Sequence, residues 1–285
     1  MAQQHTIGII GTGTMGAGLA QLAAQAGYEV VFQNRRQESV DRGVGRIQSA
    51  LDRLVSKDKI TGTAAGEAME RIRGVVALEE LKGCERLIEC APEDLGLKRE
   101  ILQKLDAIAS DESIIATNTS SLSVTKLASY LRRPGHFVGM HFFNPVPAMK
   151  LVEIVRGMRT NDSTVAAVRG LAEKLDKVPI EVKDSPGFVV NRVLFPMINE
   201  AAFALQQGVA DADGIDECMK LGCNHPLGPL ALADLVGLDV VHAILESLYK
   251  EYGEQRYAPC IEIKKRVEAG FLGRKSGRGF YQYDQ

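Results

Sequence analysis

Short apolar runs alternate with helical patterns over the first part of the chain. Residues 6–10 form the first apolar run, and residues 15–26 then show the helical period and end at Gly27. Strand-like runs recur at residues 29–32, 87–89, 114–116, 137–140 and 151–155. Strands that alternate with helices are typical of βαβ units in a parallel sheet. We therefore predict an α/β fold, with a Rossmann-type dinucleotide-binding domain over residues 1–184.

The pattern changes near residues 184–187, and helical periods follow. An apolar helix starts at residues 188–190 and runs to about residue 206, and Pro196 is expected to kink it. Residues 230–248 carry apolar side chains on more than one face, which predicts one helix buried on several sides. Residues 185–285 should thus form an all-α domain. Its apolar surface favours a subunit interface, although a self-contained helical core would also account for it.

Charge balance and cysteine usage restrict the class of protein. The 285 residues carry 34 Lys and Arg against 36 Asp and Glu, a net charge of −2, which argues against partners such as nucleic acid or a membrane surface. No apolar run is long enough to span a bilayer, and residues 1–5 lack the basic start of a signal peptide, so we expect a soluble cytoplasmic protein. The five cysteines include no C-x-x-C pair, so we expect small buried thiols, without a disulfide framework or a metal site.

A glycine-rich loop joins the first strand to the first helix. Gly11, Gly13 and Gly16 form the pattern G-x-G-x-x-G, with Thr14 and Met15 between the last two. The first glycine permits a tight turn, the second lets a pyrophosphate approach the backbone, and the third allows the helix and strand to pack closely. The N-terminus of the helix adds unpaired N–H groups and a partial positive charge. The loop therefore predicts a site for NAD or NADP.

The residue that ends the second strand selects between these two dinucleotides. An acidic residue there binds the ribose 2′-hydroxyl and repels a 2′-phosphate. This chain has Asn34 instead, followed by Arg35 and Arg36, whose guanidinium groups suit a phosphate dianion. We therefore expect NADP(H) to be favoured over NAD(H). The alternative is that both arginines face solvent and Asn34 still holds a 2′-hydroxyl.

A histidine and a glutamate occupy neighbouring strand-like runs. His141 follows residues 137–140, and Glu153 lies inside the apolar run of residues 151–155. A carboxylate in an apolar strand is unfavourable without a partner, and a histidine at the end of the adjacent strand would supply one. The residue types alone leave open a solvated glutamate and a packed histidine.

Several longer motifs are specific when taken together. They lie at residues 11–16, 118–122, 141–145, 149–153, 185–192, 225–229 and 273–281. Through them the chain resembles the L-3-hydroxyacyl-CoA dehydrogenases over essentially its whole length, and most closely the bacterial 3-hydroxybutyryl-CoA dehydrogenases. The resemblance implies hydride transfer between NAD(P) and 3-hydroxybutyryl-CoA or acetoacetyl-CoA, and a homodimer formed through the helical domain.

The resemblance also implies catalytic roles. His141 would take the proton of the C3 hydroxyl as hydride leaves for the nicotinamide, and Glu153 would orient its ring and stabilise the imidazolium. Ser120 would hydrogen-bond the C3 oxygen, and Asn191 would hold the substrate near His141. From the residues alone, Ser120 is more simply a helix N-cap in the turn of residues 118–121.

Further residues of the family pattern would contact the two ligands. Lys57, with Arg53 and Lys59 near it in a helix predicted for residues 38–59, would meet the phosphates of coenzyme A, although a solvated basic helix face is the alternative. Most relatives carry Asp at the position of Asn34, so their NAD preference does not transfer. The nicotinamide end of the cofactor would be lined by Glu93, Lys98, Asn118, Ser120, Asn144 and Lys275.

Two other functions fit parts of the sequence. A decarboxylating hydroxy-acid dehydrogenase, acting on a sugar acid or a short hydroxy acid, would share the glycine loop and Asn34-Arg35. Such enzymes typically use a lysine where this chain has His141 and Glu153. A non-catalytic dinucleotide-binding sensor would keep the glycine loop and have no need for the four catalytic candidates together.

Overall fold

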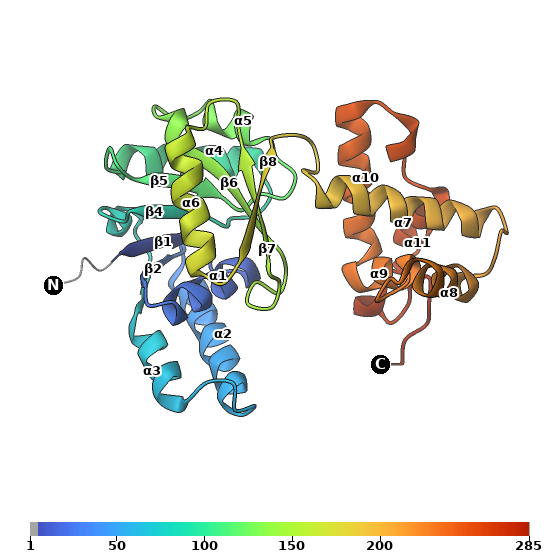
Figure 1. Ribbon diagram of the computed structural model, residues 1–285, viewed down its shortest axis with the longest axis horizontal. Helices are drawn as coiled ribbons and strands as arrows, with labels where there is room; N and C mark the ends of the chain where they lie inside the picture. The colour runs from blue at the N-terminus through green and yellow to red at the C-terminus, as the bar shows by residue number, and fades with distance from the viewer. Residues whose placement is uncertain (1–4, 285) are drawn as a thin grey trace. The chain divides into compact units, whose positions relative to one another are not determined.

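The structure, a computed structural model, describes residues 5–284 and contains two compact units (Figure 1). The units divide between Asp184 and Ser185. The first contains all the named strands, and the second is built from helices. Within the described residues, no helix is long and apolar enough to cross a membrane.

An eight-stranded sheet forms the centre of the first unit, in the order β3-β2-β1-β4-β5-β6-β7-β8. All neighbours run parallel except β6 and β7, which are antiparallel. This sheet confirms the predicted Rossmann-type α/β class. The strands are β1 (Thr6–Ile10), β2 (Glu29–Gln33), β3 (Ile72–Val75), β4 (Arg86–Glu89), β5 (Ile114–Thr117), β6 (Phe137–Phe142), β7 (Leu151–Arg156) and β8 (Val178–Lys183).

Helices pack against the sheet and complete the apolar core of this unit. Figure 1 shows α6 in front of the strands and α4 behind them. Residues of α1 and α6, including Leu19 and Val168, share one buried cluster with Ile9, Met140 and Ile154 of the sheet. The helices are α1 (Thr14–Gln25), α2 (Gln37–Val55), α3 (Gly62–Glu70), α4 (Leu95–Ile108), α5 (Val124–Ala128) and α6 (Asp162–Lys174).

The helix predicted for residues 38–59 ends earlier than expected. Helix α2 stops at Val55, and the chain turns through Asp58, which has a φ of 52°, before Thr61 caps α3. A residue in the left-handed region ends an α-helix, and the polar residues after Val55 no longer bury an apolar stripe. Lys57 therefore lies in a turn rather than in the helix. Strands β3 and β8, at the two edges of the sheet, were not predicted either.

Five α-helices in the described residues form most of the second unit around their own core. The helix predicted for residues 230–248 is two helices, because Gly237, with a φ of 103°, breaks the chain between α9 and α10. Leu235 and Val240 are 54% and 40% exposed, so this segment is also less buried than predicted. Pro196 lies inside α7. The helices are α7 (Val190–Gln206), α8 (Ala212–Cys223), α9 (Pro229–Val236), α10 (Leu238–Tyr252) and α11 (Ile261–Glu268).

The cysteines differ in their surroundings. Cys84 and Cys260 are buried, and burial raises the pKa of the Cys84 thiol to about 11. Cys218 and Cys223 are exposed on α8, so the expectation of uniformly buried thiols was wrong for these two. Helix α8 buries Ile215 and Asp216 near its start, and the two cysteines near its end stay outside the core. Among the described residues, no group of three metal-ligating side chains comes together.

Candidate active site

His141 and Glu153 face each other across the antiparallel strands β6 and β7. The register pairs them directly, and Glu153 Oε2 lies 2.7 Å from His141 Nδ1. Both are buried, with 5% of His141 and 1% of Glu153 exposed. Because an ionised carboxylate only accepts hydrogen bonds, Nδ1 carries the proton and Nε2 is the nitrogen that can take one up. The pair therefore has the chemistry of an oriented acid/base.

A cavity of about 320 Å³ lies beside His141 in the first unit. The segments that follow β1, β4, β5 and β6 supply its walls, and Asn118 Oδ1 ties two of them by accepting a 2.9 Å hydrogen bond from the Phe142 N–H. Cofactors of this fold bind at the carboxyl ends of the parallel strands, which is where this cavity lies. The predicted site residues that line it are Met15, Glu93, Asn118, Ser120, His141 and Asn144.

Glu93 holds the turn that carries Ser120. Its Oε1 accepts hydrogen bonds from Thr119 Oγ1 at 2.5 Å, from the Ser120 N–H at 2.9 Å, and from the N–H and Oγ of Ser121, each at 2.9 Å. Burial by itself would raise the pKa of the Glu93 carboxyl, but Lys98 and these hydrogen bonds outweigh burial and place the pKa below its ordinary value. Glu93 is thus an anion that fixes the position of the Ser120 backbone.

Lys98 lies deeper than the sequence suggested. Its Nζ donates to both carboxylate oxygens of Glu89, at 2.8 and 2.9 Å, and to the Ala91 carbonyl at 3.0 Å. It also lies 3.4 Å from Glu93, and it is not among the residues that line the cavity beside His141. Lys98 therefore stands behind Glu93 in this structure. Glu89 was not predicted as a site residue, although a glutamate that ends the apolar run of residues 87–89 is the same signal that singled out Glu153.

The glycine loop has the geometry that a dinucleotide requires. Gly11 has a φ of 103°, and a Cβ on Gly16 would lie 1.8 Å from the Gly11 carbonyl oxygen. A Cβ on Gly13 would meet nothing within 4 Å, so the backbone there is open to a phosphate. The loop, together with Thr14 and Met15 at the start of α1, lines a cavity of about 510 Å³. These residues fit the pyrophosphate of a dinucleotide.

Asn34 joins this loop to the next cavity. Its Nδ2 donates to Thr12 Oγ1 at 3.1 Å, and its Oδ1 accepts from the Arg36 N–H at 3.4 Å. Asn34, Arg35 and Arg36 all line a cavity of about 240 Å³, which Glu100 and Lys104 of α4, ion-paired with each other, also line. Both arginines therefore border a hollow in which a phosphate could be held.

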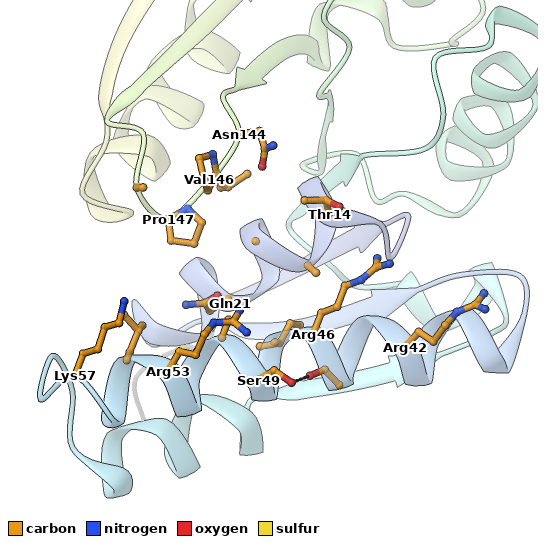
Figure 2. Close-up of a pocket in the computed structure, with 18 residues that line it drawn as sticks. Thr14, Gln21, Arg42, Arg46, Ser49, Arg53, Lys57, Asn144, Val146 and Pro147 are labelled. Atoms are coloured by element: carbon orange, nitrogen blue, oxygen red, sulfur yellow. Dashed lines mark hydrogen bonds between the residues drawn. The ribbon is translucent and has the colours of Figure 1, made fainter. Parts of the chain in front are cut away.

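A larger basic groove lies between α1, α2 and the loop after β6 (Figure 2). Its volume is about 1080 Å³, and it is lined by Arg42, Arg46, Arg53 and Lys57. None of the described residues that line it carries a carboxylate, and the opposite wall is the loop of residues 144–148. Lys57 was predicted at such a site. Arg42 and Arg46 were missed, although their spacing with Arg53 places all three on one face of the helix.

Asn191 and Lys275, the other predicted site residues, belong to the second unit. Asn191 lies in the first turn of α7 and is buried. Lys275 lies in the short helix Arg274–Ser276, and its Nζ donates to Asp239 Oδ2 at 2.7 Å. Burial alone would raise the pKa of Asp239, but the bond to Lys275 lowers it below the ordinary range. Asp239 is thus a fixed acceptor for the ammonium of Lys275.

Comparison with known families defines the class of protein. A family model described as "3-hydroxyacyl-CoA dehydrogenase, NAD binding domain" matches residues 6–185, and one described as "3-hydroxyacyl-CoA dehydrogenase, C-terminal domain" matches residues 187–283. The chain belongs to the 3-hydroxyacyl-CoA dehydrogenase family, and it is therefore an oxidoreductase with an NAD-binding domain. This confirms the predicted family and enzyme class, and it removes the non-catalytic sensor as an alternative.

Individual relatives match over almost their full length. The chain is 47% identical to a probable 3-hydroxybutyryl-CoA dehydrogenase of Deinococcus radiodurans, covering 97% of this chain and 99% of the relative. It is 45% identical to a 3-hydroxybutyryl-CoA dehydrogenase of Clostridioides difficile, covering 98% and 99%. Among solved structures, an (S)-3-hydroxybutyryl-CoA dehydrogenase from Ralstonia eutropha is 50% identical with a TM-score of 0.97, covering 99% and 100%.

Proposed function

We propose that this protein is an (S)-3-hydroxybutyryl-CoA dehydrogenase that interconverts 3-hydroxybutyryl-CoA and acetoacetyl-CoA and prefers NADP(H). The observation that carries the proposal is the buried 2.7 Å contact between His141 and Glu153, beside a cavity that Ser120 also lines. Relatives that match over their full length and are named for this reaction support the choice of substrate.

The residues of the site divide the reaction between them. A bound nicotinamide would supply the acceptor for the hydride that leaves C3. His141 Nε2 takes the proton of the C3 hydroxyl, and Glu153 stabilises the imidazolium that results. Ser120 Oγ donates a hydrogen bond to the C3 oxygen, and Asn191 orients the substrate, as the family resemblance implies. In the reverse direction His141 returns the same proton to the C3 oxygen.

The region around Asn34 supports a preference for NADP(H). The neutral amide of Asn34 does not repel a 2′-phosphate, as a carboxylate at this position would. Arg35 and Arg36 line the adjacent cavity and offer charge-assisted hydrogen bonds to a dianion. Each such bond contributes about 1.5–3 kcal/mol, enough to change cofactor preference by at least tenfold.

The basic groove is suited to coenzyme A. Its ADP portion carries a diphosphate and a 3′-phosphate, and the groove presents Arg42, Arg46, Arg53 and Lys57 without a carboxylate among the described lining residues. A chain with a net charge of −2 needs such a local concentration of cations to bind a polyanion. The groove and the cavity beside His141 share Asn144, which connects the proposed phosphate end to the reacting end.

The proposal includes a homodimer and a cytoplasmic location. Large exposed apolar side chains on the second unit, among them Val193, Leu221 and Leu235, support an interface formed through that unit. Sedimentation equilibrium of the purified protein measures the mass directly, and a monomer at micromolar concentration would contradict the dimer.

Spectrophotometric turnover tests the proposed reaction. Acetoacetyl-CoA is mixed with the protein and either NADPH or NADH, and the loss of absorbance of the reduced nicotinamide is followed. We expect turnover with both cofactors and the higher kcat/KM with NADPH. Oxidation of a sugar acid in place of 3-hydroxybutyryl-CoA would favour the decarboxylating class instead. No turnover of acetoacetyl-CoA with either cofactor would reject the proposal.

A further inference from the structure

Arg42 and Arg46 border two cavities at once. Both line the cavity of about 510 Å³ at the glycine loop and also the basic groove of about 1080 Å³. Arg53 lines the groove and not the glycine-loop cavity, whereas Arg35 lines the 240 Å³ cavity beside Asn34 and neither of the other two. In Figure 2, Arg46 rises from α2 toward Thr14, and Arg42 lies nearer the start of the same helix. The two arginines therefore mark the place where the proposed dinucleotide site and the proposed coenzyme A site meet.

Close packing holds the start of α2 at this meeting point. A Cβ on Gly43 would lie 2.7 Å from the Phe32 ring and 2.8 Å from Thr12 Cβ, so only glycine lets the helix come this near to the glycine loop. Thr12 Oγ1 also donates to the Ser39 carbonyl at 2.7 Å. These contacts fix the backbone of α2 beside the loop. Arg42 and Arg46, on either side of Gly43 along the helix, are consequently presented from a rigid element.

The charges of the two arginines are available to ligands. Within the described chain, no carboxylate lies at ion-pair distance from Arg42 or Arg46, and Arg42 makes one 3.2 Å hydrogen bond to Ser39 Oγ. Two polyanions in adjoining cavities repel each other when their phosphates lie within about one Debye length, about 8 Å at physiological salt. A cation between them lowers that repulsion.

We propose that Arg46, assisted by Arg42, couples the binding of the dinucleotide to the binding of coenzyme A by standing between their phosphates. This inference rests on the proposed function, because it takes the groove to be the coenzyme A site. When one ligand is already bound, the protein with the arginine then binds the other ligand more tightly than a protein without it. Because coupling is reciprocal, the factor is the same in whichever order the ligands are added.

Calorimetric titration of the full-length protein tests the coupling. Free coenzyme A is titrated with and without saturating NADP⁺, which gives two Kd values and their ratio, and no turnover occurs with this pair. We expect Arg46→Gln to raise the Kd of coenzyme A by a larger factor when NADP⁺ is present than when it is absent. The first factor should be at least about five times the second. Arg46→Lys should keep most of the wild-type ratio, because it keeps the charge. The difference between Arg46→Gln and wild type should also shrink at 0.5 M salt, since screening weakens charge coupling.

Arg53→Gln is the matched control on the same helix. It removes a cation that lines the groove and not the glycine-loop cavity, so it should weaken coenzyme A binding by the same factor with and without NADP⁺. An Arg46→Gln ratio equal to that of wild type would overturn the coupling while leaving the proposed function intact. A wild-type protein that does not bind coenzyme A would overturn the proposed function, and the coupling with it.

Discussion

Lys98 and Glu89 form an ion pair that is almost fully withdrawn from solvent. The Lys98 ammonium lies 2.8 Å from one carboxylate oxygen of Glu89, and the side chains are 1% and 0% exposed. The same ammonium lies 3.4 Å from Glu93, which holds the backbone of Ser120. The pair therefore links the end of β4 to the turn that carries a proposed catalytic residue.

Removing one member of this pair should strongly destabilise the protein. In Glu89→Gln the ammonium stays buried with less compensation, and breaking such a pair costs about 3–5 kcal/mol of unfolding free energy. Urea unfolding followed by circular dichroism measures the loss. The double variant Glu89→Gln/Lys98→Met should lose less than the sum of the two single variants, because the partners interact. Glu100→Gln, which removes one member of the exposed Glu100–Lys104 pair, is the control and should change little. Equal unfolding free energies of Glu89→Gln and wild type would show that the Glu89–Lys98 ion pair does not stabilise the fold.

The lowered pKa of Glu93 predicts that part of the protein's stability is lost at acid pH. Its carboxyl titrates lower in the folded than in the unfolded protein, so the unfolded state binds more protons at acid pH. The stabilisation is fully present above the unfolded value of about 4.3 and is lost as the pH falls below it toward the folded value. The difference in unfolding free energy between wild type and Glu93→Gln should therefore be largest near neutral pH and shrink in that window. The exposed Glu112→Gln serves as the control. A difference that stays constant down to about pH 3 would show that the ionised carboxylate of Glu93 is not the cause.

His141 and Glu153 should act as one unit in turnover. His141→Ala should lower kcat at least about 10²-fold, the usual size of general acid–base catalysis, while the Kd of NADP⁺ stays unchanged. Glu153→Gln should also lower kcat, because an amide neither charge-stabilises the imidazolium nor selects the required tautomer. The double variant should be no slower than His141→Ala alone, since Glu153 works only through the ring. Steady-state kinetics with acetoacetyl-CoA decides this, and additive losses would separate the two residues.

The sequence predicts the centre of the sheet better than its edges. Strands β1, β2 and β4 to β7 are continuous buried runs, so apolarity alone reveals them. At the edges, β3 contains the exposed Arg73, and β8 exposes Val178 and Ile180, so neither strand shows a clear pattern. In the sequence, Gly237 is a single glycine within a helical pattern, which a continuous helix tolerates. Its φ of 103° in the structure shows that two helices meet there.

In the candidate site, too, the sequence predicts the positions of some side chains and not of others. The pairing of His141 with Glu153 could be anticipated because a carboxylate in an apolar strand requires a partner. The depth of Lys98 could not, since lysine is normally solvated and its partner Glu89 comes from another element. Arg42 and Arg46 are ordinary surface residues in the sequence, and that they line two cavities is seen once α2 is packed against Thr12 and Phe32 at Gly43.

Lys177 should determine the shape of the basic groove. It is buried, and its Nζ donates to the carbonyls of Val146 at 2.6 Å and Met149 at 2.8 Å, in the loop whose residues 144–148 form one wall of the groove. Lys177→Met would leave these carbonyls without a donor and loosen the loop. We expect the KM for acetoacetyl-CoA to rise about fivefold or more, with a smaller change in kcat and in the KM for NADPH. The exposed Lys174→Met is the matched control. A Lys177→Met enzyme with an unaltered KM for acetoacetyl-CoA would show that the loop does not depend on this ammonium.

Cofactor preference should change at a single position. In Asn34→Asp a carboxylate would face the 2′-phosphate of NADP(H) and accept a hydrogen bond from the 2′-hydroxyl of NAD(H). The ratio of kcat/KM for NADPH to that for NADH should fall at least about tenfold, and Arg35→Gln should lower it further by removing a charge-assisted bond. The ratio is the proper measure, because the variant also loses the hydrogen bond from Asn34 to Thr12, and any general damage acts on both cofactors. Arg159→Gln removes an exposed arginine in the turn after β7 and should leave the ratio as in wild type. If Asn34→Asp keeps the wild-type ratio, the 2′-substituent does not lie at this residue, and the preference must be sought elsewhere along the dinucleotide.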